Sequence, residues 1–234
     1  MYQLMQKKNI IIFIPSIEGG GVEKNLFLIA NHFAKKFESV TLITSSYQFK
    51  KKFQKKINFV GPQMRFLEKM NRLVKYIVCS IYLMLEVTKK KNVTVFSFQG
   101  NLFAIIISKL FSIKVAARAN SAPSGWIKNY VKKKIFKFIY SLSNIIIVNS
   151  LEFQKDFKTL LNIKSECIYN PLDKKRILKL SKKKIRTFNS NKHSLKILNV
   201  GRLVDQKNHI LLLQALSKLK DKITFELIIL GNGK

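Results

Sequence analysis

Two cations and a glycine near the end of the chain form the pattern best suited to chemistry. The stretch Ile197–Leu216 is expected to fold as a buried strand, a turn with Gly201, Arg202 and Lys207, and a helix. Positive side chains at the carboxyl end of a strand, beside a helix amino terminus, suit a diphosphate. In a lysine-rich chain an ordinary surface loop is the alternative, and the sequence leaves both open.

A glycine-rich turn near the start of the chain is the second candidate. Gly20 and Gly21 follow the apolar run 9–14 and precede a predicted helix. Glycines at such a turn let backbone N–H groups approach a phosphate, which the helix amino terminus also attracts. The turn lacks the third glycine of the dinucleotide-binding fingerprint, because Lys24 stands there. A phosphate-binding loop and a simple tight turn both remain open.

A third candidate, Arg118 with Asn120, stands at the end of a predicted strand. Ligands of parallel α/β sheets bind at the carboxyl ends of strands, so both side chains could bind an acceptor substrate. They could equally hold the loop that follows.

Other reactive arrangements are missing from the sequence. It contains no serine-elbow motif and no metal-ligand spacing, so we expect no metal site. Cys79 and Cys167 lie far apart in the sequence and are expected to be reduced.

Short apolar runs alternate with longer helical patterns along the chain. The predicted strands are 9–14, 40–44, 92–98, 114–117, 144–149, 166–169, 195–200 and 223–230. The predicted helices are 22–37, 64–90, 102–111, 123–142, 151–161 and 208–219. Continuously apolar runs are typical of strands buried on both faces of a parallel sheet. The alternation therefore predicts a doubly wound, Rossmann-like α/β fold.

A turn signal at 170–173 and the basic, weakly periodic residues after it interrupt this alternation. We therefore predict an amino-terminal domain over residues 1–175, a linker over 176–193 and part of a second Rossmann-like domain over 194–234. A piece of about 40 residues is too small to bury a core of its own. It is expected to lean on the first domain, to pair with another chain, or to be partly unstable.

The charge balance is strongly basic. The 234 residues carry a formal net charge of +32, from 44 lysines and arginines against 12 acidic residues. Such a chain attracts nucleic acid, acidic lipid surfaces and phosphorylated substrates. Only six of the 44 are arginine, whereas nucleic-acid readers rely on the arginine fork. We favour A/T-rich coding as the origin of the lysines and expect no specific nucleic-acid partner.

The predicted helix over 123–142 places apolar and aromatic side chains on one face and lysines elsewhere. The apolar face can combine Trp126, Tyr130, Ile135, Phe138 and Ile139. A basic amphipathic helix with aromatic residues suits contact with a membrane surface. A core-packed helix with a solvated lysine face is the alternative. We predict neither a signal peptide nor a membrane-spanning segment.

Taken together, these segments resemble glycosyltransferase family 4, the retaining sugar transferases of GT-B architecture. Residues 10–44 are similar to the family's first strand, Gly-Gly-x-Glu loop, helix and second strand. Residues 148–157 and 168–173 resemble its Asn-Ser segment and the Asn-Pro-x-Asp approach to its linker. Residues 197–216 and 227–234 resemble the start of its donor-binding domain. The order and spacing of the pieces carry the resemblance.

The resemblance implies transfer of a hexose-type sugar from a nucleotide sugar, UDP-linked, to a glycan acceptor, lipid-linked or free, in surface polysaccharide or glycan assembly. It implies that Arg202 and Lys207 neutralise the departing diphosphate. It also implies that Gly20 and Gly21 offer backbone amides to the same phosphates, while Arg118 and Asn120 lie on the acceptor side. The nucleotide sugar is the substrate, and neither a metal nor another cofactor is required.

The resemblance also has a gap. The family's paired glutamates, which engage the donor sugar, would lie beyond Lys234. We therefore expect an incomplete transferase of low activity alone, with unassigned catalytic residues and a separate carboxyl-terminal half as a candidate partner. The resemblance suits a cytoplasmic protein that is peripheral to the membrane and touches its anionic surface. A non-catalytic module that binds membrane surfaces or lipid phosphates is the alternative.

Overall fold

The computed structural model describes residues 9–18, 20–63, 70–90, 92–183 and 194–233. The chain divides into two compact units, Met1–Asp173 (unit 1) and Lys174–Lys234 (unit 2), and each is described by itself.

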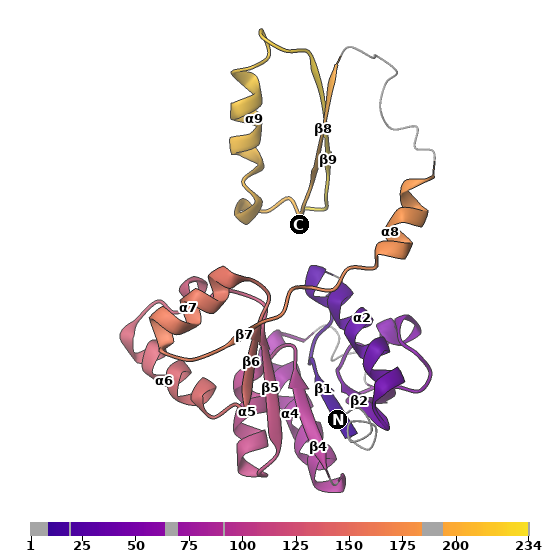
Figure 1. The fold of residues 1–234 in the computed structure, drawn as a ribbon, viewed down its shortest axis with the longest axis vertical. Helices are drawn as coiled ribbons and strands as arrows, with labels where there is room; N and C mark the ends of the chain where they lie inside the picture. Colours follow the sequence, from indigo (N-terminus) through magenta and orange to yellow (C-terminus); the bar gives the residue numbers. More distant parts are fainter. Residues whose placement is uncertain (1–8, 19, 64–69, 91, 184–193, 234) are drawn as a thin grey trace. The chain divides into compact units, whose positions relative to one another are not determined.

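Unit 1 is built on a seven-stranded sheet in the order β3-β2-β1-β4-β5-β6-β7 (Figure 1). Every neighbouring pair of strands in it is parallel. The strands are β1 (Asn9–Phe13), β2 (Ser39–Ile43), β3 (Asn58–Val60), β4 (Val93–Ser97), β5 (Lys114–Ala119), β6 (Ile145–Val148) and β7 (Glu166–Cys167). The strand order reverses direction between β1 and β4, which makes this the switch point where doubly wound sheets bind ligands.

Helices cover both faces of this sheet. They are α2 (Gly21–Lys36), α4 (Arg72–Lys89), α5 (Asn101–Leu110), α6 (Tyr130–Ser141) and α7 (Leu151–Leu161). Short 3-10 turns lie at η1 (Tyr47–Lys52) and η2 (Pro123–Gly125). Side chains of α2 share one apolar cluster with Ile10 and Ile12 of β1. Side chains of α4, α5, α6 and α7 share the other cluster with Ile11 and Phe13. Successive side chains from Ile10 to Phe13 of β1 are apolar and point to alternate faces of the sheet, so β1 contributes to both clusters. The predicted α/β fold class is confirmed.

Unit 2 contains α8 (Lys174–Ser181), β8 (Leu195–Val200), η3 (Asp205–Lys207), α9 (His209–Ser217) and β9 (Phe225–Leu230). Its two strands pair in parallel, from Leu195 opposite Phe225 to Val200 opposite Leu230. The strand–helix–strand order of this unit agrees with the prediction. Helix α8 occupies the beginning of the segment predicted as a linker, and residues 184–193 of that segment lie outside the described residues.

The single helix predicted over 123–142 is wrong. The segment begins with the 3-10 turn η2, and α6 starts only at Tyr130, because the side chain of Asn129 accepts a hydrogen bond from the N–H of Lys132 and caps the helix there. Trp126 lies before the helix and packs against the ring of Phe136, with 4.5 Å between ring centres. Trp126 therefore belongs to the core side of unit 1 and not to an exposed amphipathic face.

Two smaller differences concern the segments next to β2. No strand was predicted between 44 and 92, but the short edge strand β3 lies there, after the 3-10 turn η1. The helix predicted over 64–90 is described from Arg72 onward as α4, with Asn71 as its cap, and positions 64–69 fall outside the described residues. Among the described helices, none is both long and apolar enough to cross a bilayer.

Burial of Cys79 generates a prediction about thiol chemistry. This side chain on α4 is fully buried, and burial raises the pKa of its thiol to about 12. Cys167 at the end of β7 is partly exposed, and both cysteines are free. Because the thiolate is the reactive form, iodoacetamide at about pH 8 should label Cys167 in the folded chain and Cys79 only after denaturation. Peptide mass spectrometry checks this, and equal labelling of both in the folded chain would contradict it.

Candidate functional site

The glycine-rich turn joins the carboxyl end of β1 to α2, at the switch point of the sheet. Hydrogen bonds to the end of β2 fix the first half of the turn. The N–H of Ile17 donates to the hydroxyl of Ser46 over 2.9 Å, and the hydroxyl of Ser45 donates to the carbonyl of Pro15 over 2.7 Å. The turn therefore has a defined course before it reaches the glycines.

A buried carboxylate shapes the second half of this turn. Glu23 in the first turn of α2 is buried, and its Oε1 accepts a hydrogen bond from the N–H of Glu18 over 3.3 Å. A Cβ added to Gly20 would lie 3.0 Å from Oε2 of the same carboxylate. Gly20 thus leaves room for Glu23, and the carboxylate gains from the partial positive charge of the helix amino terminus.

Gly21 has different surroundings. It is the first residue of α2, and a Cβ added there would meet nothing within 4 Å. The helix cap at Gly20 has no side-chain hydrogen bond. The amino terminus of α2 therefore presents backbone and open space at Gly21, which is the arrangement that an approaching phosphate requires.

The glycine turn is also linked to the start of α4. Arg72 donates two hydrogen bonds to Glu18, from Nε to Oε1 over 2.9 Å and from Nη2 to Oε2 over 2.7 Å. The bonds to this carboxylate raise the pKa of Arg72. Both side chains are at least half exposed, so the pair orients the turn more than it stabilises the fold.

Arg118 and Asn120 lie at the carboxyl end of β5, and each donates a hydrogen bond within unit 1, while the buried Nε of Arg118 has no partner among the described residues. Arg118 is 2% exposed, and its Nη2 donates to Oδ1 of Asn170 over 2.7 Å. Its guanidinium carbon lies 5.9 Å from the ring centre of Phe98, and burial lowers its pKa. Asn120 donates from Nδ2 to the carbonyl of Phe98 over 2.8 Å. These contacts match the loop-holding alternative.

The diphosphate candidate in unit 2 forms the predicted strand, turn and helix. A Cβ added to Gly201 would lie 3.5 Å from Cγ of Lys207, so the aliphatic part of Lys207 runs across the end of β8. Nε2 of His209 lies 3.0 Å from the carbonyl oxygen of Arg202. Because a carbonyl only accepts, this ring nitrogen must carry the proton. Lys207 and the backbone of Arg202 are thereby held at one end of the strand.

Both cations of this turn are exposed to solvent. Within the described part of the chain, neither Arg202 nor Lys207 forms an ion pair with a carboxylate. Their positive charge is therefore available to an anionic ligand. Arg202 and Lys207 thus belong to the same turn of unit 2, and Gly20 and Gly21 to the glycine turn of unit 1.

Sequence reasoning missed the part played by Glu23 and Asn101. Glu23 stands three residues after the cap of α2, which is the capping-box spacing and was a usable signal. Asn101 accepts from the hydroxyl of Ser97 over 2.7 Å and donates to the carbonyl of Arg118 over 3.0 Å. That link between β4 and β5 depends on the strand order, so no local sequence pattern indicates it. The described residues contain no cluster of three potential metal ligands.

Comparison with solved structures shows the fold. HepE from Anabaena, in complex with UDP and glucose, is similar over 97% of this chain and 62% of its own, with a TM-score of 0.67 and 14% identity. A glycosyltransferase from Rickettsia africae is similar over 96% of this chain and 60% of its own, with a TM-score of 0.62 and 20% identity. The fold is that of these Rossmann-like glycosyltransferase structures. The amino-terminal domain of Candida albicans trehalose-6-phosphate phosphatase is also similar, over 98% of this chain and 65% of its own, with a TM-score of 0.66 and 13% identity.

Sequence comparison gives one curated relative at a modest level. An uncharacterized glycosyltransferase of Methanocaldococcus jannaschii is 29% identical over 145 residues. The match covers 56% of this chain and 36% of the relative, so this chain spans little more than a third of that protein. No protein-family model matches the sequence.

Substitution of Glu23 tests how the glycine turn is held. Glu23→Ala should lower the free energy of unfolding by about 1–2 kcal/mol, because the Glu18 N–H loses its acceptor and α2 loses a favourable charge. Glu23→Gln should lower it less, since its amide oxygen still accepts the bond. Urea unfolding measures both. The control is Glu152→Ala, which removes an exposed carboxylate from the first turn of α7. Equal losses for Glu23→Ala and Glu152→Ala would contradict the role assigned to Glu23.

Proposed function

We propose that the chain acts in glycosyl transfer, as the part of a retaining transferase that binds a nucleotide sugar and receives a glycan acceptor. The observation that carries the proposal is the turn after β8, where Arg202 and Lys207 stand together without an ion-pair partner among the described residues. Support comes from the fold, because one similar structure, HepE, is a complex with UDP and glucose. We also propose that the nucleotide is UDP and that the sugar is of the hexose type.

The chemistry follows from charge. When a sugar leaves a nucleotide diphosphate, negative charge develops on the phosphate oxygens of the leaving group. Fixed cations at that position stabilise the transition state more than the ground state, which accelerates the transfer. The planar fork of Arg202 suits two phosphate oxygens at once, whereas Lys207 contributes a point charge. In this proposal both residues bind the diphosphate, and the open backbone at Gly21 is a separate phosphate-binding candidate in unit 1.

The acceptor side of the proposed site lies at the carboxyl edge of the unit 1 sheet. The hydrogen bonds of Arg118 to Asn170 and of Asn120 to Phe98 favour a positioning role for both residues. We propose that they set the loops that receive the acceptor, a glycan that is free or lipid-linked, in surface polysaccharide or glycan assembly. The chain spans 36% of its curated relative. Catalytic turnover by the whole protein is therefore also part of this proposal.

Substitution of the two cations tests the donor part of the proposal. Arg202→Ala and Lys207→Ala should each weaken UDP binding about tenfold or more, because a charge-assisted hydrogen bond is worth about 1.5–3 kcal/mol. Saturation-transfer NMR with UDP, followed by titration, measures the change. The matched control is Lys220→Ala, an exposed lysine of the same unit in the turn before β9. If Lys220→Ala weakens binding as much as Arg202→Ala, the turn after β8 has no special role.

A glycine substitution tests the contribution of unit 1. Gly21→Ala should leave the free energy of unfolding within about 0.5 kcal/mol of the parent chain, because its new methyl group meets open space. It should nevertheless weaken UDP binding, because the methyl group stands where a phosphate would approach the backbone. Gly125→Ala is the control, since its Cβ also meets nothing within 4 Å. Unchanged UDP affinity in Gly21→Ala would show that the glycine turn does not bind the nucleotide.

A further inference from the structure

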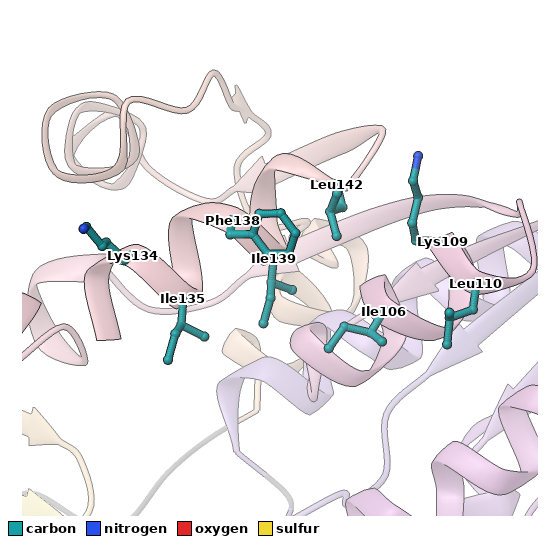
Figure 2. A pocket seen from close by; sticks show the side chains of 8 residues that line it. All are labelled: Ile106, Lys109, Leu110, Lys134, Ile135, Phe138, Ile139 and Leu142. Atoms are coloured by element: carbon teal, nitrogen blue, oxygen red, sulfur yellow. The ribbon is translucent and has the colours of Figure 1, made fainter. Parts of the chain in front are cut away.

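An apolar groove lies between α5 and α6 on the outer side of unit 1. It has a volume of about 610 Å³, and its apolar lining consists of Ile106, Leu110, Ile135, Phe138, Ile139 and Leu142. Figure 2 shows Ile135 and Ile139 of α6 and Ile106 of α5 around the space between the two helices. Several of these side chains are unusually exposed for their type, with Leu110 at 74% and Phe138 at 66%. A contiguous exposed apolar surface of this kind marks a contact site.

Lysines flank the groove on both helices. Lys109 of α5 and Lys134 of α6 line it, and their ammonium groups point away from the apolar side chains in Figure 2. Further lysines on α6 are Lys132, Lys133 and Lys137, and neither helix contains an acidic residue. Long lysine side chains can cover apolar surface with their stems while the charged ends reach anionic groups. The groove is therefore apolar in its middle, with Lys109 and Lys134 as its charged lining residues.

A second exposed apolar surface lies on α4, which packs beside α5. The exposed stripe on α4 consists of Leu73, Ile77, Ile81 and Leu85. These residues recur every four positions, so they lie along one side of that helix. Exposed apolar side chains therefore occur on three helices of unit 1, which suits a broad partner surface better than a small ligand.

We propose that the α5–α6 groove and its lysines dock unit 1 on an anionic phospholipid bilayer. Apolar side chains such as Leu110 and Phe138 would enter the boundary between head groups and acyl chains, and the lysines would contact lipid phosphates. A second copy of the chain is a poor occupant, because a two-fold contact would bring Lys109 and Lys134 against the same two lysines of that copy. Contact with a bilayer goes beyond the proposed sugar transfer and does not depend on it.

The test must separate this surface from the general attraction of a +32 chain to anionic lipid. Sedimentation with vesicles of phosphatidylcholine and phosphatidylglycerol, over a salt series, measures partitioning of the full chain. The Lys134→Glu/Lys137→Glu variant should partition about tenfold less than the parent chain. The control is Lys55→Glu/Lys56→Glu, which makes the same change in net charge next to Phe53 and Ile57 of the opposite cluster. Equal loss in the two double variants would overturn the proposal.

The apolar part has its own test. Leu110→Gln/Phe138→Gln should also reduce partitioning about tenfold, and more of this loss should persist at high salt, because apolar insertion is not screened. Leu172→Gln, at a residue 75% exposed elsewhere in unit 1, is the control and should bind as the parent does.

A depth measurement provides a readout that charge alone does not move. Lipids with brominated acyl chains should quench the fluorescence of the tryptophan introduced by Phe138→Trp, whereas the tryptophan introduced by Leu172→Trp should keep its fluorescence. Absence of quenching at position 138 would overturn the proposal. Failure of the parent chain to bind anionic vesicles at low salt would also overturn it. So would a dimer, detected by light scattering, that Leu110→Gln/Phe138→Gln dissociates while vesicle binding is unchanged.

Discussion

Burial of β1 on both faces, between β2 and β4, is the constraint on which unit 1 depends. A central parallel strand satisfies its backbone only when neighbours pair on both edges, and it stays out of water only when helices cover both faces. Ile10 and Ile12 serve one cluster, and Ile11 and Phe13 serve the other. The chain therefore winds to one side through β2 and β3 and to the other through β4 to β7. Loops from the two directions separate at the carboxyl end of β1, where the glycine turn stands.

Polar contacts then fix the loops at this edge. Two ionic groups are buried there in different ways. Glu23 sits beside the amino terminus of α2, where the helix supplies a compensating partial charge. Arg118 has an amide oxygen of Asn170 and the ring of Phe98 as its neighbours, a weaker compensation that agrees with the lowered pKa of its guanidinium. Arg118 connects segments that are distant in the sequence, whereas Glu23 ties the glycine turn to the helix that follows it, so the carboxyl edge is set before any ligand arrives.

The sequence allowed the buried strands to be predicted well and the capped helices less well. The continuous apolar run of β1 indicates a strand clearly, because burial on both faces leaves no room for polar residues. The run at β8 was predicted as a buried strand and does form a strand, but none of its side chains is fully buried. The helix predicted over 123–142 failed because its apolar periodicity continued through Gly125 to Asn129, while the cap at Asn129 decided the true start. Strand β3 was overlooked because three residues at a sheet edge carry little pattern. The contacts of Arg118 and Asn101 follow from strand order, which no local signal contains.

The diphosphate turn depends on local backbone contacts more than on a core. Among the described residues of unit 2, Leu216 is the one fully buried apolar side chain. The turn is nevertheless held by hydrogen bonds from the N–H of Gly201 to Leu230 and from the N–H of Leu203 to Asn232, over 2.9 and 3.0 Å. A Cβ on Gly231 would collide with the carbonyl of Gly201, so the two strand ends can approach only because that residue is glycine. In the proposed function, two charges of the turn attract the diphosphate, and this attraction needs little buried area. Choice of base and sugar requires shaped apolar contacts, which this turn does not supply.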